Sequence, residues 1–107
     1  MAELVVQKAS ITGIAPVFSL ADIAGDTFTN YGNSVFHVDN QSASAVTVTI
    51  ASSLCNFGEA HDIVTSIPAG EERIFGSFDK NRFNDENFKV NVSYDVVTSV
   101  NVAVIQY

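Results

Sequence analysis

The sequence predicts an all-β fold, a single antiparallel β-sandwich of about seven or eight strands, jelly-roll-like or immunoglobulin-like. Valine and isoleucine together number 23, against three leucines. Side chains branched at Cβ are restricted in a helical turn and pack well on a pleated sheet. Apolar and polar residues alternate in several runs, and these runs recur at about 8 to 15 residues without a helical period.

The first half of the chain contains four segments that fit strands. Residues 4–8 and a short segment at 17–20 are apolar enough to add strands near the N-terminus. A turn at Tyr31-Gly32-Asn33 opens a strand over 34–39. The polar run 40–44 then leads into a strand over 45–51, whose valines and threonines alternate with period two.

The second half adds four more strands. Pro68-Ala69-Gly70 forms a turn that joins a strand over 61–67 to one over 71–78. Alternation over 89–95 and 100–104 predicts two strands, which we expect to form an antiparallel hairpin through 96–99. Between these pairs, Asp79 is suited to cap a single helical turn within 79–84.

Length and charge limit the functional classes. A chain of 107 residues is expected to form one domain over 1–107, with residues 1–16 either an edge strand or an arm that pairs with a neighbour's sheet. The net charge of −7, with five basic residues, disfavours nucleic-acid binding. No apolar run is long enough for a bilayer and no secretion signal is evident, so we expect synthesis in the cytoplasm and no membrane partner.

The sequence contains few residues that would fit a metal site or a catalytic site. His37, Glu59, His61 and Asp62 are ligand types, but on a strand only Glu59 and His61 share a face, and His37 joins them only if its strand lies alongside. Cys55 is the single cysteine and fits a small buried apolar residue. Nucleophile elbows and phosphate-binding glycine loops are absent, so the sequence predicts no enzyme, metal or cofactor.

Aromatic side chains in predicted loops are the candidate binding residues. The connections 21–33 and 52–60 carry aromatic residues, which surface loops of a monomer usually avoid. The residues proposed to bind a partner are Phe28, Tyr31, Phe57 and Phe83. The alternative is that these rings fold over the open ends of the sandwich as part of the core, and the sequence leaves both possibilities open.

Several segments resemble small virion proteins of tailed bacteriophages. They are Gly25-Asp26-Thr27-Phe28-Thr29-Asn30, Phe36-His37-Val38-Asp39-Asn40, residues 68–78, Arg82-Phe83-Asn84-Asp85, Ser93-Tyr94 and Thr98-Ser99-Val100. The resemblance covers most of the chain. It implies a β-sandwich that serves as a structural component of a phage particle, without catalytic residues.

Within that class the expected function is a capsid decoration, or cement, protein that binds the outside of the head lattice. The resemblance implies partners among the major capsid protein or other virion proteins, a homo-oligomer with a trimer favoured, and a location in the virion after synthesis in the host cytoplasm. The alternatives are a head-tail connector or tail component, and a carbohydrate-binding module that uses exposed aromatic rings. An enzyme ranks last.

Overall fold

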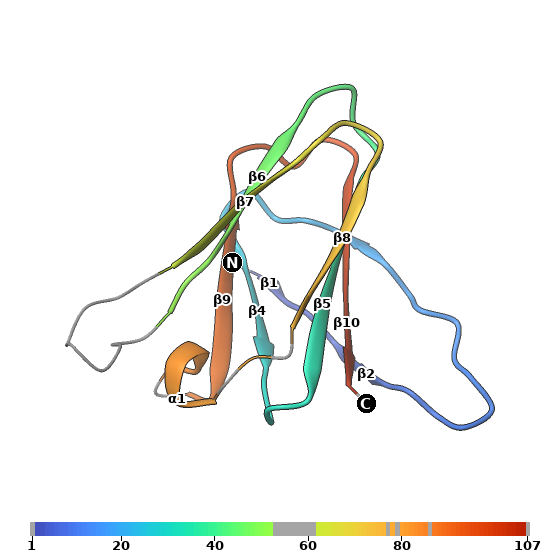
Figure 1. Ribbon diagram of the computed structural model, residues 1–107, viewed down its shortest axis with the longest axis vertical. Coiled ribbons are helices and arrows are strands. Elements are labelled where there is room, and N and C mark those ends of the chain that lie inside the picture. Colours follow the sequence, from blue (N-terminus) through green and yellow to red (C-terminus); the bar gives the residue numbers. More distant parts are fainter. Residues whose placement is uncertain (1, 53–61, 77, 79, 86, 107) are drawn as a thin grey trace.

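The computed structural model describes residues 2–52, 62–76, 78, 80–85 and 87–106, which form ten strands and one helical turn. The predicted all-β sandwich is confirmed: two five-stranded sheets pack face to face (Figure 1). The first sheet has the order β1–β4–β9–β6–β7, and the second has β2–β10–β5–β8, with β3 also pairing with β10. The elements are β1 (Ala2–Glu3), β2 (Val6–Lys8), β3 (Ser19–Leu20), β4 (Asp26–Thr29), β5 (Ser34–Asn40), β6 (Val46–Ile50), β7 (Ile63–Ile67), β8 (Glu72–Gly76), α1 (Lys80–Phe83), β9 (Lys89–Tyr94) and β10 (Val100–Gln106).

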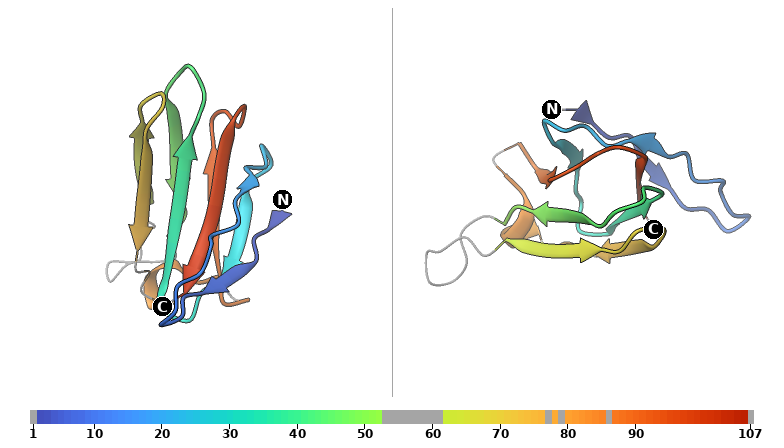
Figure 2. Two further views of the ribbon diagram at one scale, coloured as in Figure 1. Left: turned by 90° about the vertical axis from the view of Figure 1, so that its right-hand side faces the viewer. Right: turned by 90° about the horizontal axis from the view of Figure 1, so that it is seen from above.

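The core lies between the two sheets and follows the alternation of the sequence. The two sheets lie face to face (Figure 2). Every second residue of β5, β6 and β9, and Val100, Val102 and Val104 of β10, are buried, so these strands line the space between the sheets. Aromatic rings extend this core toward α1. Phe28 contacts both Phe36 and Phe78 at centroid distances of 5.6 Å, and Phe78 packs edge-on against Phe83 at 5.3 Å.

Two predicted turns join strands of different sheets. We expected a hairpin through 96–99, but β9 belongs to the first sheet and β10 to the second. The turn at Pro68-Ala69-Gly70 likewise carries the chain from β7 in the first sheet to β8 in the second. The hairpin expectation is wrong because period-two alternation shows which face of a strand is buried and leaves its neighbour undetermined.

Among the strands of the described residues, one consecutive pair, β6 and β7, are neighbours in a sheet. Their antiparallel register runs from Val46 opposite Ile67 to Ile50 opposite Ile63. The connection between them contains the predicted loop 52–60, most of which lies outside the described residues. Every other connection from β4 to β10 passes from one sheet to the other, so the strands of each sheet come from distant parts of the chain.

Strand β4 is absent from the prediction, which placed its residues in the loop 21–33. Asp26, Thr27 and Phe28 are all buried, so this strand shows no alternation of apolar and polar residues. It pairs antiparallel with β9, from Asp26 opposite Val92 to Thr29 opposite Lys89. A buried strand of this composition is possible because its polar side chains find partners inside the protein.

Asp26 is the buried carboxyl of this strand. Its Oδ2 accepts a hydrogen bond of 2.7 Å from the Tyr94 hydroxyl, whereas Oδ1 has no partner within the part of the chain that the structure describes. Burial raises the pKa of Asp26 above its ordinary value, and the hydrogen bond from Tyr94 opposes this rise. Burial, together with the carboxylate, raises the pKa of Tyr94, so its hydroxyl stays protonated and donates.

Tyr94→Phe is expected to lower the free energy of unfolding by about 1–3 kcal/mol at neutral pH, because the buried carboxylate loses the shorter of its two hydrogen bonds and keeps the one from the Asp22 N–H. This decrease in the free energy of unfolding should become smaller as the pH falls. Without the hydroxyl the folded-state pKa of Asp26 rises further above the unfolded value, so the additional cost applies where the carboxyl is ionised and disappears once it is protonated. Urea unfolding from about pH 8 to about pH 4 measures this. Tyr31→Phe, at an exposed ring, is the control, and a pH-independent difference would contradict the assignment.

The N-terminal residues add edge strands to both sheets. Strand β1 pairs in parallel with β4, and the Leu4 N–H donates to the Thr27 carbonyl at 2.7 Å. The chain then crosses over, and β2 pairs in parallel with β10, where Val6 lies opposite Val104. Residues 2–8 therefore take the edge-strand alternative within their own chain.

Three turns meet at one end of the sandwich, at the top of Figure 1. Asn40, the last residue of β5, makes hydrogen bonds to two of them. The Asn40 backbone N–H donates to the Glu71 carbonyl, and the Asn40 carbonyl accepts from the Gly70 N–H, both at 2.9 Å. The next residue, Gln41, donates its backbone N–H to the Ser99 carbonyl. The turns after β5, β7 and β9 are thus held together by backbone hydrogen bonds.

Candidate functional site

Two of the four predicted binding residues belong to the core. Phe28 is fully buried in β4, and its ring stacks on Phe36 at an interplanar angle of 18°. Phe83, in α1, is also buried and lies against Phe78. Neither ring is exposed in the folded chain, so neither offers a partner a free surface. For both, the alternative of a core position holds.

The other two predicted residues have different outcomes. Phe57 lies outside the described residues. Tyr31 is 63% exposed, and with Phe88, which is 69% exposed, it lines a cleft of about 750 Å³. This cleft, called here the Tyr31–Phe88 cleft, is bordered by Thr29, Asn30, Tyr31, Lys80, Asn84, Asp85, Asn87 and Phe88.

Phe88 is the binding candidate that sequence reasoning missed. It is in phase with Val90 and Val92, so alternation places its side chain in the core. Its backbone has a φ of 63°, in the left-handed region, and this conformation departs from the extended strand. A positive φ at a phenylalanine carries no sequence signal, which is why the pattern could not reveal an exposed ring here.

Asp85 holds the loop that carries Phe88. Its Oδ1 accepts hydrogen bonds from the backbone N–H groups of Asn87 at 2.8 Å and Lys89 at 3.1 Å, and its Oδ2 accepts one from the Asn91 amide at 3.0 Å. The bond from Asn91, more than any other, lowers the pKa of Asp85. The carboxylate is thus a structural part of the loop with its acceptor sites occupied.

The base of the cleft is a pair of asparagines. The Asn30 amide donates to Asn84 Oδ1 at 2.8 Å, and the Asn84 amide donates back to the Asn30 carbonyl at 3.0 Å. Asn30 also donates to the Phe78 carbonyl and accepts from the Gly32 N–H. These bonds tie the β4–β5 turn to the segment after α1, so the turn that carries Tyr31 has a fixed position beside the Phe88 loop.

A second candidate surface is apolar and lies along the N-terminal segment. Six of the eleven large hydrophobic residues that are exposed in the described structure fall within the first 23 residues. The N-terminal apolar surface is defined by Val5, Ile11, Ile14, Val17, Leu20 and Ile23. The segment between β2 and β3 extends away from the body of the sandwich, as the blue trace in Figure 1 and in the right-hand view of Figure 2 shows.

A hollow of about 400 Å³ lies beside this surface, and its lining is mostly apolar. Leu4, Val5 and Val17 border it from the N-terminal segment, and Val102 and Val104 border it from β10. Each copy of the chain therefore carries both a projecting apolar segment and an apolar recess of side-chain size.

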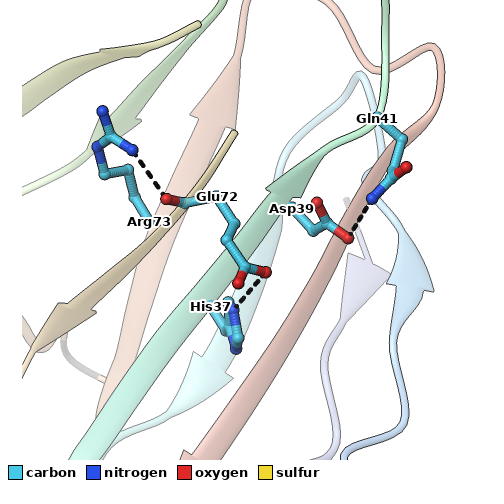
Figure 3. Close-up of polar contacts among 5 residues, drawn as sticks. All are labelled: His37, Asp39, Gln41, Glu72 and Arg73. Carbon is cyan, nitrogen blue, oxygen red and sulfur yellow. Dashed lines mark hydrogen bonds and ion pairs between the residues drawn. The ribbon is translucent and has the colours of Figure 1, made fainter. Parts of the chain in front are cut away.

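The candidate metal ligands do not come together. His37 Nε2 lies 3.1 Å from Glu72 Oε2, across β5 and β8 on the outer face of the second sheet, where Asp39 also accepts from Gln41 (Figure 3). Asp62 precedes β7 in the first sheet and accepts from the Ser52 N–H. Glu59 and His61 lie outside the described residues. Among the residues that are described, no three potential ligands form a cluster.

No protein-family model, curated protein or solved structure matches this chain. Within the described part of the chain, there is no helix that could span a membrane. The function is therefore inferred from the two surfaces above and from the resemblance in the sequence.

Proposed function

We propose that this chain is a non-enzymatic structural protein of a tailed-phage particle, a capsid decoration protein that binds the outside of the head lattice. The class comes from the sequence segments that resemble phage virion proteins. The observation that supports an assembly role is the N-terminal apolar surface. Five of its side chains, those of Val5, Ile11, Val17, Leu20 and Ile23, are each at least 61% exposed.

Such a concentration of exposed apolar side chains favours a protein interface. Single exposed hydrophobic residues are common on monomers, whereas six of them within 23 residues of chain are typical of a segment that another protein covers. Burial of a valine or isoleucine side chain contributes about 1.5–3 kcal/mol, so covering several of them gives a substantial association energy. The partner is a second copy or a capsid subunit.

The shape of the segment favours a closed ring of copies. The segment between β2 and β3 projects from the sandwich (Figure 1), and the hollow bordered by Val5 and Val17 lies where the two ends of this segment meet β10. A segment that enters the hollow of the next copy makes a head-to-tail contact, and three such contacts close a trimer. The trimer would then offer three equivalent patches to the capsid, so a weak single contact suffices.

The charge and the energetics fit a particle surface. A ligand that binds the assembled lattice and not its free subunits stabilises the lattice by mass action. The net charge of −7 gives the protein no attraction to packaged DNA. Both features suit a protein that bridges the outer faces of neighbouring subunits of the major capsid protein.

Ile11→Asp combined with Val17→Asp is expected to convert the oligomer to a monomer, because two charges would be buried in the interface. Sedimentation velocity measures the oligomeric state, and circular dichroism checks that the sandwich is intact. Val64→Asp is the matched control, since Val64 is 63% exposed on β7 and lies outside the N-terminal surface. A wild-type protein that is monomeric at every concentration would contradict self-assembly through this surface.

A separate measurement tests where in the phage particle this chain is located. Quantitative mass spectrometry of purified phage particles gives the copy number of this chain relative to the major capsid protein. A ratio near one per capsid subunit supports decoration of the head. A count of about six or twelve, as a ring at a portal requires, would instead support a connector or tail component. Absence from the particle would overturn the virion assignment.

A further inference from the structure

We propose that the Tyr31–Phe88 cleft is a saccharide-binding site that accepts a pyranose ring between its two aromatic side chains. This site is separate from the N-terminal apolar surface and goes beyond the proposed assembly role. The observations that carry it are two exposed rings held at one end of the first sheet, the strained backbone of one of them, and the polar groups between them.

The fold brings the two rings to one place. In the ladder between β4 and β9, Thr29 lies opposite Lys89. Tyr31 follows Thr29 by two residues as the chain leaves β4, and Phe88 immediately precedes Lys89 as the chain enters β9. The Asn30 N–H donates to the Phe88 carbonyl at 3.1 Å, which extends the ladder between the two aromatic residues. Their positions are therefore set by the sheet.

Phe88 is turned toward solvent by a backbone conformation that costs free energy. A φ of 63° is unusual for a bulky side chain and persists only where surrounding contacts enforce it. Here the Phe88 N–H donates to the Asp85 carbonyl at 3.1 Å, its carbonyl is bound by Asn30, and Asp85 fixes the loop. Exposing the ring contributes no burial to the fold, so a role at the surface explains it better than a role in stability.

The polar groups of the cleft match a ligand that carries hydroxyl groups. Lys80 and Asn87 are both exposed at its border and supply an ammonium donor and a side-chain amide. A Cβ placed on Gly32 would lie 3.7 Å from Lys80 Cε, so the lysine stem runs along the turn that carries Tyr31. A sugar has an apolar C–H face that suits an aromatic ring and hydroxyl groups at its edge that suit these donors.

The size of the cleft and the paired amides of its base are also consistent with a small polar ligand. A volume of about 750 Å³ falls within the range of small-molecule sites, about 300–1,000 Å³. The Asn30–Asn84 pair makes the base rigid, so the two rings are positioned before a ligand arrives. Lys80 and Asn87 are hydrogen-bond donors that hydroxyl groups can use and an apolar peptide side chain cannot, which favours a sugar over such a side chain.

The test is saturation-transfer difference NMR on the full chain with glucose, galactose, N-acetylglucosamine and rhamnose as separate probes. At least one sugar should give transfer to its ring C–H protons. Tyr31→Ala and Phe88→Gly should each weaken its binding by about tenfold or more, as for the loss of a stacking surface. Ile74→Ala, at an exposed position on β8, should leave binding unchanged.

Phe88→Gly separates binding from folding. Glycine adopts a positive φ without strain, so this variant should keep or raise the melting temperature while it loses the sugar. No transfer from any of the four sugars would overturn the proposal, and so would transfer that survives both aromatic substitutions. Sedimentation of the same variants should show an unchanged oligomeric state, so failure here is distinguishable from failure of the assembly role.

Discussion

Phe28→Ala is expected to lower the free energy of unfolding by about 3–5 kcal/mol, the range for a large aromatic side chain removed from a core. The ring is fully buried and contacts Phe36 and Phe78. It joins the apolar layer between the sheets to the aromatic cluster beside α1. Alanine would leave a cavity that neighbouring strands cannot close, because β4 is held between β1 and β9 by backbone hydrogen bonds.

Phe88→Ala is the matched control for this substitution. It removes the same atoms from a ring that is exposed, so the free energy of unfolding should change by less than about 0.5 kcal/mol. Urea unfolding followed by circular dichroism measures both variants under the same conditions. If Phe28→Ala cost no more than Phe88→Ala, Phe28 would have to be a surface residue, one of the two positions that the sequence left open.

Asn40→Ala is expected to have the next largest effect, a loss of about 3 kcal/mol, because buried carbonyl groups would lose their donor. The buried Asn40 amide donates to the carbonyls of Ser44 at 2.9 Å, Ile67 at 3.0 Å and Pro68 at 3.2 Å. Its Oδ1 accepts from the Ser42 hydroxyl at 2.6 Å. One side chain thus satisfies backbone groups from two turns that lie far apart in the sequence.

Gln41→Ala is the control for Asn40→Ala. It tests whether the loss in unfolding free energy on removing a side-chain amide depends on the position of that amide among the turns. The Gln41 side chain makes one exposed hydrogen bond, to Asp39 at 2.7 Å, and its removal should cost less than about 1 kcal/mol. Thermal and urea unfolding of both variants provide the comparison. Equal losses for Asn40→Ala and Gln41→Ala would mean that the three turns do not depend on the Asn40 amide.

Alternation predicted the strands that have one buried and one exposed face. Strands β5, β6 and β9 lie within one residue of their expected limits, and the single turn of α1 falls inside the segment where Asp79 was expected to cap it. Asp79 itself lies outside the described residues. The strands depend on neighbouring residues, because the direction of successive side chains alternates along a strand. Features of this local kind can be predicted from a single sequence.

The remaining features depend on contacts between distant residues. Strand β4 was missed because Asp26 reaches a buried partner, Tyr94, that local sequence does not identify. Whether a turn joins two strands of one sheet or leads to the other sheet depends on how whole strands pack. In the candidate cleft, Tyr31 was among the rings proposed to bind a partner. Phe88 was not, because its outward direction comes from a backbone angle fixed by Asp85 and Asn30.

The position of β10 determines when the second sheet can form. This strand pairs with β2, β3 and β5, whose residues all precede it by a long stretch of chain. During synthesis, β5 can pair early with β8, whereas β2 and β3 lack their neighbour β10 until residues 100–106 have left the ribosome. Pairing between such distant segments requires costly loop closure, and sandwiches of this kind fold in milliseconds to seconds. The unpaired edges exposed during that interval are open to association with other chains, which makes rapid completion of β10 important for the yield of folded protein.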